Sequence, residues 1–199
     1  MTITTVIPTL GRDTLWTRAV PSVVCQKADW RIIIVGDGVD IEAPFDDPRI
    51  RILRIDRPDY PKDEHEHWRI GGVRAFDFGL DHVETEWWSY LADDDEYLPN
   101  HHGSLLRWAG TCDVSIGTWE FRRHGTVVMA NNPPGNMEVM QGAYIIRTVL
   151  DHRPKDTDLA VPHVGWDADW WQRLGARSGI RYHVSPDVVA RYHSAIKRA

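Results

Sequence analysis

Residues 87–99 read WWSYLADDDEYLP, an apolar segment that runs directly into three consecutive aspartates. Residues 87–92 predict a buried strand, because a short continuous apolar run that ends in polar residues is typical of a strand covered on both faces. Asp93, Asp94 and Asp95 then stand at the end of this strand. Three neighbouring carboxylates repel one another, so we expect a compensating cation beside them. A solvated acidic turn that caps the next helix is the alternative interpretation.

The first third of the chain alternates strand and helix patterns. Residues 2–7 and 31–35 are largely apolar, residues 49–55 alternate between apolar and basic side chains, and a helix up to about Gln26 is expected between the first two strands. This order favours an α/β layered fold with a mostly parallel sheet. In such sheets ligands bind at the carboxyl ends of the strands, so the residues that follow each strand are the candidate site.

The rest of the chain continues with mixed patterns. We expect a mobile loop at 56–67, helices at 70–82, 99–108 and 166–177, two or three strands within 112–129, a loop at 131–137 and an edge strand at 180–193.

Tryptophan is unusually frequent, with ten residues in the chain. Core packing is the simpler explanation, and stacking on sugars or bases is the alternative. Because adjacent strand residues point to opposite faces, we expect Trp87 and Trp88 to enter different layers.

Composition excludes several classes of protein. The chain has 199 residues, which fits one domain, and its formal net charge of −6 disfavours bulk binding to nucleic acid. No apolar run approaches the roughly 20 residues of a membrane helix, and the N-terminus has no signal-peptide pattern. Cys25 and Cys112 lack metal-ligand spacing and are interpreted as reduced thiols. We therefore expect a cytoplasmic protein.

Three short motifs occur in a characteristic order. Residues 8–12 read PTLGR after the first strand, residues 35–38 read VGDG after the second, and residues 91–99 carry the acidic triplet. Together they resemble the GT-A nucleotide-diphospho-sugar glycosyltransferases, in particular the family 2-like enzymes, over about residues 2–100. The resemblance implies a three-layer α/β/α fold with a central mixed, mostly parallel sheet. It also implies one glycosyltransferase domain over 1–199, with a donor half to about residue 100 and an acceptor half from about 101.

The resemblance suggests roles for the donor side. Thr9 matches the position that borders the nucleotide base, and Asp37 matches the aspartate that bonds a uracil-like edge. A turn aspartate that bonds its own backbone is the alternative for Asp37. In the Asp-x-Asp element, Asp93 or Asp94 corresponds to the ribose position. Asp95 corresponds to the residue that holds Mn²⁺ or Mg²⁺ against the diphosphate, where the cation offsets the charge of the leaving group.

Some positions depart from the family pattern. Gly36 stands where the family often has a first aspartate, and Phe76 stands where it often has an arginine that faces the diphosphate. Arg74 is the nearby candidate for phosphate binding, although two residues along a helix point in different directions. His193 corresponds to a C-terminal histidine that returns to the metal in many GT-A enzymes. An ordinary exposed histidine is the alternative.

Residues 165–169 read GWDAD and resemble the Gly-Glu-Asp-x-Asp segment that opens a late helix in the family. Asp167 is the expected general base, and Asp169 is the second candidate. Asp167 could instead cap the helix, where the positive helix end favours a carboxylate. Trp166 and Trp170 share a helix face and either stack on an acceptor ring or belong to the core.

Together these expectations predict a metal-dependent, inverting hexosyltransferase-type enzyme. It would move a sugar from a nucleoside-diphosphate donor, with UDP as the expected nucleotide, to a hydroxyl of a glycan, protein, small molecule or modified nucleic acid. A sugar-1-phosphate nucleotidyltransferase is one alternative, although residues 9–12 are sparse for its phosphate loop. A non-catalytic, tryptophan-rich carbohydrate-binding protein is the other.

Overall fold

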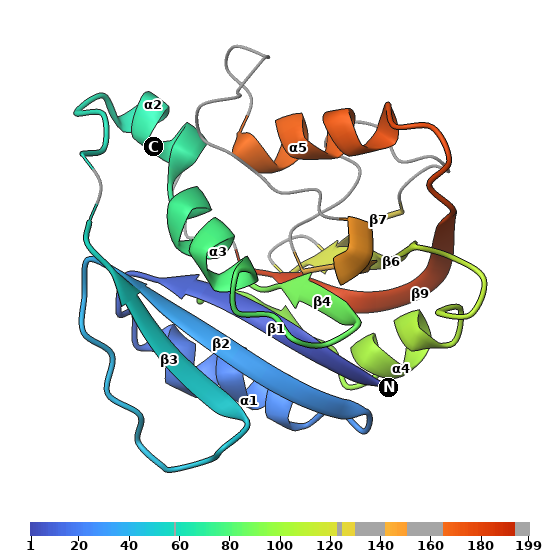
Figure 1. Cartoon of the computed structure of the whole chain (residues 1–199), viewed down its shortest axis with the longest axis horizontal. Coiled ribbons are helices and arrows are strands. Elements are labelled where there is room, and N and C mark those ends of the chain that lie inside the picture. The colour runs from blue at the N-terminus through green and yellow to red at the C-terminus, as the bar shows by residue number, and fades with distance from the viewer. Residues whose placement is uncertain (58, 123–124, 130–141, 151–164, 194–199) are drawn as a thin grey trace.

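The computed structural model describes residues 1–57, 59–122, 125–129, 142–150 and 165–193 (Figure 1). The strands are β1 (Thr2–Thr9), β2 (Asp29–Asp37), β3 (Ile50–Ile55), β4 (Trp87–Tyr90), β5 (Glu96–Tyr97), β6 (Val114–Phe121), β7 (Thr126–Val128), β8 (Tyr144–Arg147) and β9 (Tyr182–Tyr192). The helices are α1 (Val20–Val24), α2 (Glu64–Ile70), α3 (Val73–Leu80), α4 (His101–Leu106) and α5 (Trp166–Gly175). A π-helical turn at Leu15–Ala19 precedes α1, and a 3₁₀ turn at Thr148–Leu150 follows β8.

One mixed sheet joins strands from both halves of the chain. Its order is β3-β2-β1-β4-β8-β6-β9-β5, and β7 pairs with β6 beside this row. Strands β3, β2, β1 and β4 are parallel, β8 is antiparallel to β4 and β6, and β9 is parallel to β6. The expected mixed sheet is therefore confirmed. Because β1, β2 and β4 run the same way, their carboxyl ends meet at one edge of the sheet.

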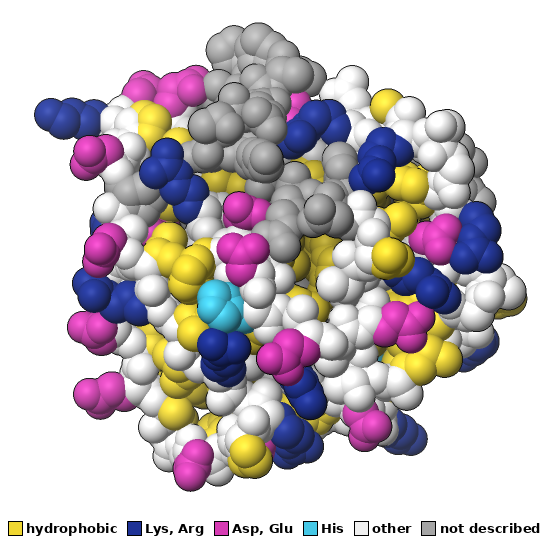
Figure 2. Space-filling model, viewed as in Figure 1, with side chains coloured by type: hydrophobic (Ala, Val, Ile, Leu, Met, Phe, Trp, Pro, Cys, Tyr) yellow, Lys and Arg dark blue, Asp and Glu magenta, His cyan; other side chains and the backbone are white. Residues whose placement is uncertain are grey.

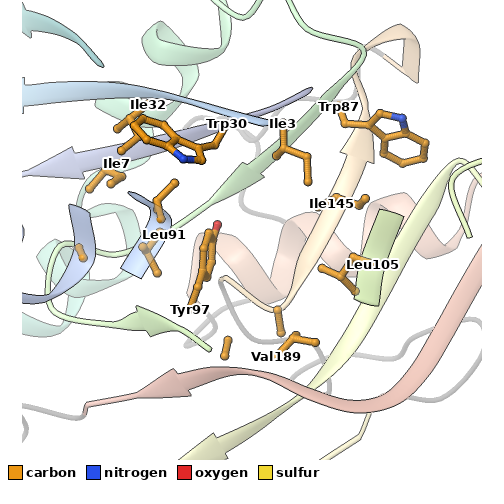
Figure 3. Close-up of a cluster of buried hydrophobic side chains, with 14 of the residues drawn as sticks. Ile3, Ile7, Trp30, Ile32, Trp87, Leu91, Tyr97, Leu105, Ile145 and Val189 are labelled. Atoms are coloured by element: carbon orange, nitrogen blue, oxygen red, sulfur yellow. The ribbon is translucent and has the colours of Figure 1, made fainter. Parts of the chain in front are cut away.

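Helices cover both faces of the sheet and make three layers. On one face α1 and α4 enclose a core that includes Ile3, Trp87 and Leu105, which are labelled in Figure 3. On the other face α3 and α5 enclose a second core that contains Trp88. The two adjacent tryptophans of β4 thus enter different layers, as their alternation predicts.

The second core is built largely from aromatic rings. Trp166, Trp170 and Trp171 of α5 are at most 3% exposed. Trp170 lies 5.8 Å from the ring of Trp88, and Trp166 lies 5.6 Å from that of Phe76. The Trp166 and Trp170 pair therefore belongs to the core, because its rings are used in packing α5 onto the sheet.

The first expected helix is divided at Pro21. Proline has no N–H, so it interrupts the interior of a helix but fits its first turn. The chain accordingly forms a π-helical turn over Leu15–Ala19 and then α1, with Pro21 in its first turn.

Two expectations about the segments are wrong. The end of the expected loop at 56–67 is helical, because α2 starts at Glu64 and the Asp63 side chain caps it by accepting from the Glu66 N–H at 2.9 Å. The C-terminal strand β9 is not at the edge of the sheet, because β5 pairs with its outer side through Glu96 and Tyr97. The expected loop at 131–137 lies outside the described residues.

The surface in Figure 2 shows acidic and basic side chains interspersed over the described part of the viewed face. None of the helices within the described ranges is long and apolar enough to cross a lipid bilayer.

Close packing of α3 on the sheet gives a stability prediction. A Cβ added at Gly79 would lie 2.5 Å from Val6 Cγ1 and 3.1 Å from Val35 Cγ2, so α3 rests on β1 and β2 at this residue. We expect Gly79→Ala to lower the free energy of unfolding by about 1–3 kcal/mol, the usual cost of overpacking. Urea denaturation monitored by circular dichroism measures this change.

Gly103 provides the matched control, because it is also helical but has no atom within 4 Å of an added Cβ. Gly103→Ala should raise stability by about 0.5–1 kcal/mol, since alanine favours a helix more than glycine does. Equal effects of the two substitutions would contradict the packing described for α3.

Candidate active site

The candidate site lies where β1, β2 and β4 end. Thr9 is the last residue of β1, Asp37 is the last residue of β2, and Asp93–Asp95 form the turn after β4. The register pairs Thr9 with Gly36, which places Asp37 one residue beyond. Thr9, Asp37, Asp93 and Asp95 are each at most 3% exposed. Polar groups are buried this deeply only where they have partners or serve a ligand.

Asp93 is held on both sides. The Thr9 hydroxyl donates to Asp93 Oδ2 at 2.6 Å, and Arg12 Nη1 donates to Asp93 Oδ1 at 2.7 Å. The same Arg12 nitrogen lies 3.2 Å from Asp94 Oδ2. The compensating cation expected at the acidic triplet is thus supplied in part by an arginine of the chain.

Arg18 also reaches the acidic turn. It projects from the π-helical turn that follows β1, and its Nη1 donates to the Asp94 carbonyl oxygen at 2.5 Å. Two guanidinium groups from the segment after β1 therefore stabilise the turn after β4. Neither arginine could be given this role from the sequence pattern, although Arg12 belongs to the PTLGR motif itself.

Asp95 is the least compensated carboxylate of the three. Burial raises its pKa well above the usual range, the His193 backbone N–H opposes this rise, and the charge of Asp94 adds to it. That N–H donates to Asp95 Oδ1 at 2.8 Å. The end of β9 therefore reaches the acidic turn, and a cation beside Asp95 would relieve the charge that burial disfavours.

The His193 ring contacts a different carboxylate. Its Nε2 lies 3.0 Å from Glu96 Oε1, and burial lowers the pKa of His193. Among the described residues no group of three His, Cys, Asp or Glu side chains is arranged to hold a metal ion. Mg²⁺ usually takes one or two carboxylates and completes its shell with water and substrate phosphates. Asp95, whose charge burial disfavours, would be a carboxylate ligand of such a partial site.

Asp37 has one oxygen in use and one available. The Tyr60 hydroxyl donates to Asp37 Oδ2, whereas Oδ1 is buried and has no hydrogen-bond partner in the described structure. Asp37 bonds a tyrosine 23 residues away, which differs from the alternative of a turn aspartate that bonds its own backbone. A buried acceptor without a donor costs about 1–3 kcal/mol, so Oδ1 fits an N–H group of a ligand.

The departure at Gly36 has a steric reason. A Cβ at this position would collide with the carbonyl oxygen of Val39, because the loop after β2 folds back over the strand end. An aspartate is therefore incompatible with this loop conformation, and Asp37 alone supplies a carboxylate at the end of β2.

Tyr60 was not identified from the sequence, because it falls in the stretch interpreted as a loop. Its ring stacks on that of His67, with centroids 4.6 Å apart and planes 8° apart. Burial and the hydrogen bond to Asp37 raise the pKa of Tyr60, and the charge of Arg74 opposes this rise. Arg74 is exposed near the start of α3, and its charge affects Tyr60.

The two carboxylates of α5 differ in their surroundings. The helix begins at Trp166 with Gly165 as its N-cap, so Asp167 lies in the first turn and is not the N-cap residue. Asp169 is 1% exposed and pairs with Arg173 at 2.9 Å. Asp167 is half-buried, whereas Asp169 is committed to an ion pair within its own helix.

Tyr90 connects α5 to the acidic turn. Burial is the main cause that raises the pKa of Tyr90, and the charges of Asp93, Asp167 and Asp95 add to it. The Tyr90 ring also packs edge-on against Trp166 of α5, with ring centroids 5.6 Å apart.

Comparisons with solved structures identify the fold. No family model matches the sequence, and no curated protein matches it. The structure of residues 1–349 of TarS from S. aureus, a GT-A-like glycosyltransferase, aligns with a TM-score of 0.65 and 12% identity, over 96% of this chain and 60% of that one.

A structure of S. aureus TarS also has a TM-score of 0.65 at 12% identity, over 98% of this chain and 37% of that one. The complex of TarS 1–349 with UDP-GlcNAc has a TM-score of 0.60 at 12% identity, over 96% and 58%. This chain thus spans 60% or less of the TarS chains that it matches. The protein therefore has the GT-A fold of nucleotide-sugar glycosyltransferases.

Proposed function

We propose that this protein transfers a sugar from a nucleoside-diphosphate donor to an acceptor hydroxyl, with a UDP-sugar as the donor. The observation that carries the proposal is the buried, unpartnered Oδ1 of Asp37 at the same sheet edge as the acidic turn. The TarS structures with UDP and with UDP-GlcNAc support a nucleotide-sugar donor.

The donor would bind along the carboxyl ends of three strands. Asp37 Oδ1 accepts the N3–H of the uracil ring, and Thr9 borders the base. Asp93 or Asp94 would lie near the ribose, and Asp95 would hold Mn²⁺ or Mg²⁺ at the diphosphate. The bound cation would supply positive charge to the departing nucleoside diphosphate. Arg74 would be a phosphate-binding residue on the Tyr60 side of the site, and the His193 ring, which contacts Glu96 in the ligand-free structure, would be a second metal ligand.

Asp167 is the proposed general base. It takes the proton of the acceptor hydroxyl while that oxygen attacks the anomeric carbon, and the bond from that carbon to the diphosphate oxygen breaks. A single displacement of this kind inverts the anomeric configuration. Asp169 forms an ion pair with Arg173 within its own helix, and taking up a proton would break that pair, which disfavours Asp169 as the base.

The tryptophans do not support a carbohydrate-binding module. Those of β4 and α5 are buried in the core, so their frequency is explained by packing.

Base recognition is tested by Asp37→Asn. This variant replaces a carboxylate with an amide that can also donate, so UDP affinity should fall about tenfold or more, the size of a lost hydrogen bond to a charged group. The affinity for CDP should fall less than that for UDP, or rise, because cytosine N3 accepts a hydrogen bond that the asparagine amide can donate. Isothermal titration calorimetry with UDP and CDP measures both affinities. An unchanged preference for UDP over CDP would contradict the proposed role.

Asp95→Asn tests the metal and the buried charge together. Mn²⁺-dependent binding of UDP should disappear, as measured by calorimetry with Mn²⁺ and with EDTA. The pKa of Asp95 is raised on folding, so its stabilising contribution is greatest below the unfolded value of about 3.9 and is lost as pH rises through the folded value. The melting temperature of the ligand-free variant should therefore exceed that of the wild type at pH 7, and this difference should shrink at pH 4.

Asp56→Asn is the matched control, because this carboxylate is 99% exposed. It should leave UDP binding and the melting temperature unchanged. Normal Mn²⁺-dependent UDP binding by Asp95→Asn would exclude Asp95 as a ligand.

Asp167→Asn tests the base. An amide cannot take a proton at neutral pH, so the release of UDP from a UDP-sugar should slow by about 10²–10⁴-fold while UDP affinity stays the same. Asp169→Asn should retain most of the activity and lower the melting temperature, because Arg173 loses its buried partner. Activity lost in Asp169→Asn but kept in Asp167→Asn would show that Asp169, and not Asp167, is the general base.

A further inference from the structure

Arg12 has more hydrogen-bond donors than its contacts with the acidic turn use. Its contacts with Asp93 and Asp94 in the described structure all use Nη1, and its side chain is 51% exposed. A guanidinium carries five N–H donors in a planar fork. Arg12 is thus fixed at one nitrogen by a buried carboxylate and has further donors on an exposed side chain.

Asp93 makes this arrangement rigid. Its side chain is 4% exposed, and both of its oxygens are engaged, one by the Thr9 hydroxyl and one by Arg12. A buried, charge-assisted hydrogen bond of this kind fixes a side chain better than an exposed pair does. The head of Arg12 is therefore held at the end of β1, beside the turn after β4.

An independent observation indicates a ligand at the same edge. The buried Asp37 Oδ1 has no partner in the described structure, and β2, β1 and β4 are consecutive strands of the sheet. The Asp93 carboxylate bonds Thr9 at the end of β1, and Thr9 is paired with Gly36, the neighbour of Asp37. A ligand with an N–H group at one end and an anion at the other would meet Asp37 and Arg12 together.

We propose that Arg12 binds the diphosphate of the donor while it remains paired with Asp93. This inference rests on the proposed function, because it names a residue for the same donor. A guanidinium fork matches phosphate oxygens and keeps its charge at every physiological pH. Its charge also reduces the repulsion between the acidic turn and the diphosphate.

The test compares a ligand that has phosphates with one that lacks them. Calorimetry measures the affinities of UDP and uridine for the wild type, Arg12→Gln, Arg12→Lys and Arg31→Gln. Arg12→Gln should weaken UDP about tenfold or more, as expected for a lost charge-assisted hydrogen bond, and change uridine affinity less than about twofold. Arg12→Lys keeps the charge and the pairing with Asp93 but loses the fork, so its loss for UDP should be smaller. It also serves as the readout if Arg12→Gln does not fold.

Arg31→Gln is the matched control. Arg31 is 53% exposed, pairs with Glu84 at 3.3 Å, and lies near the start of β2, away from the strand ends of the site. This substitution changes the net charge equally and should leave both affinities unchanged. An equal loss for UDP and uridine in the Arg12 variants would show that Arg12 only supports the turn, and an unchanged UDP affinity would also overturn the inference. A wild-type protein that binds neither ligand would instead overturn the proposed function, and the inference with it.

Discussion

The burial of Asp93 is the constraint on which the site depends. A carboxylate that is 3% exposed must have its charge and its lone pairs satisfied within the protein. Thr9 and Arg12 do so, and both come from the end of β1 or the residues after it. This requirement ties the first strand of the chain to the turn after β4. The same requirement explains why a threonine ends β1 and why an arginine follows three residues later.

Much of the fold could be predicted because its central strands are short apolar runs that end in polar turns. Strands β1, β2 and β4 have this form, β3 alternates between apolar and basic residues, and α3 shows a helical period. Strand β5 has two residues, too few to show any alternation, and α2 has only seven residues and begins with Glu-His-Glu-His, so it shows no clear apolar period. Its start depends on Asp63 as a cap for the Glu66 N–H, a local signal that periodicity does not contain. The interior place of β9 also depends on β5, so it could not be predicted either.

The positions of the candidate site residues were easier to predict than their partners. Strand ends in a parallel sheet meet at one edge, so Thr9, Asp37 and the acidic turn could be brought together on pattern alone. Tyr60 and Arg12 could not be assigned, because their contacts join residues that are 23 and 81 positions apart. The ion pair of Asp169 with Arg173 joins residues four positions apart in one helix, so the helical period alone could have indicated it.

The hydrogen bond from the His193 backbone to Asp95 has a consequence for how the chain matures. It joins residues 98 positions apart, and it is made by the residue that follows the last strand. Contacts of such long sequence separation form late, because the intervening chain loses entropy when the loop closes. During synthesis the acidic turn leaves the ribosome well before residue 193. Until β9 docks, Asp95 therefore lacks the hydrogen bond from the His193 N–H. The acidic turn gains its full set of contacts only when the sheet is complete.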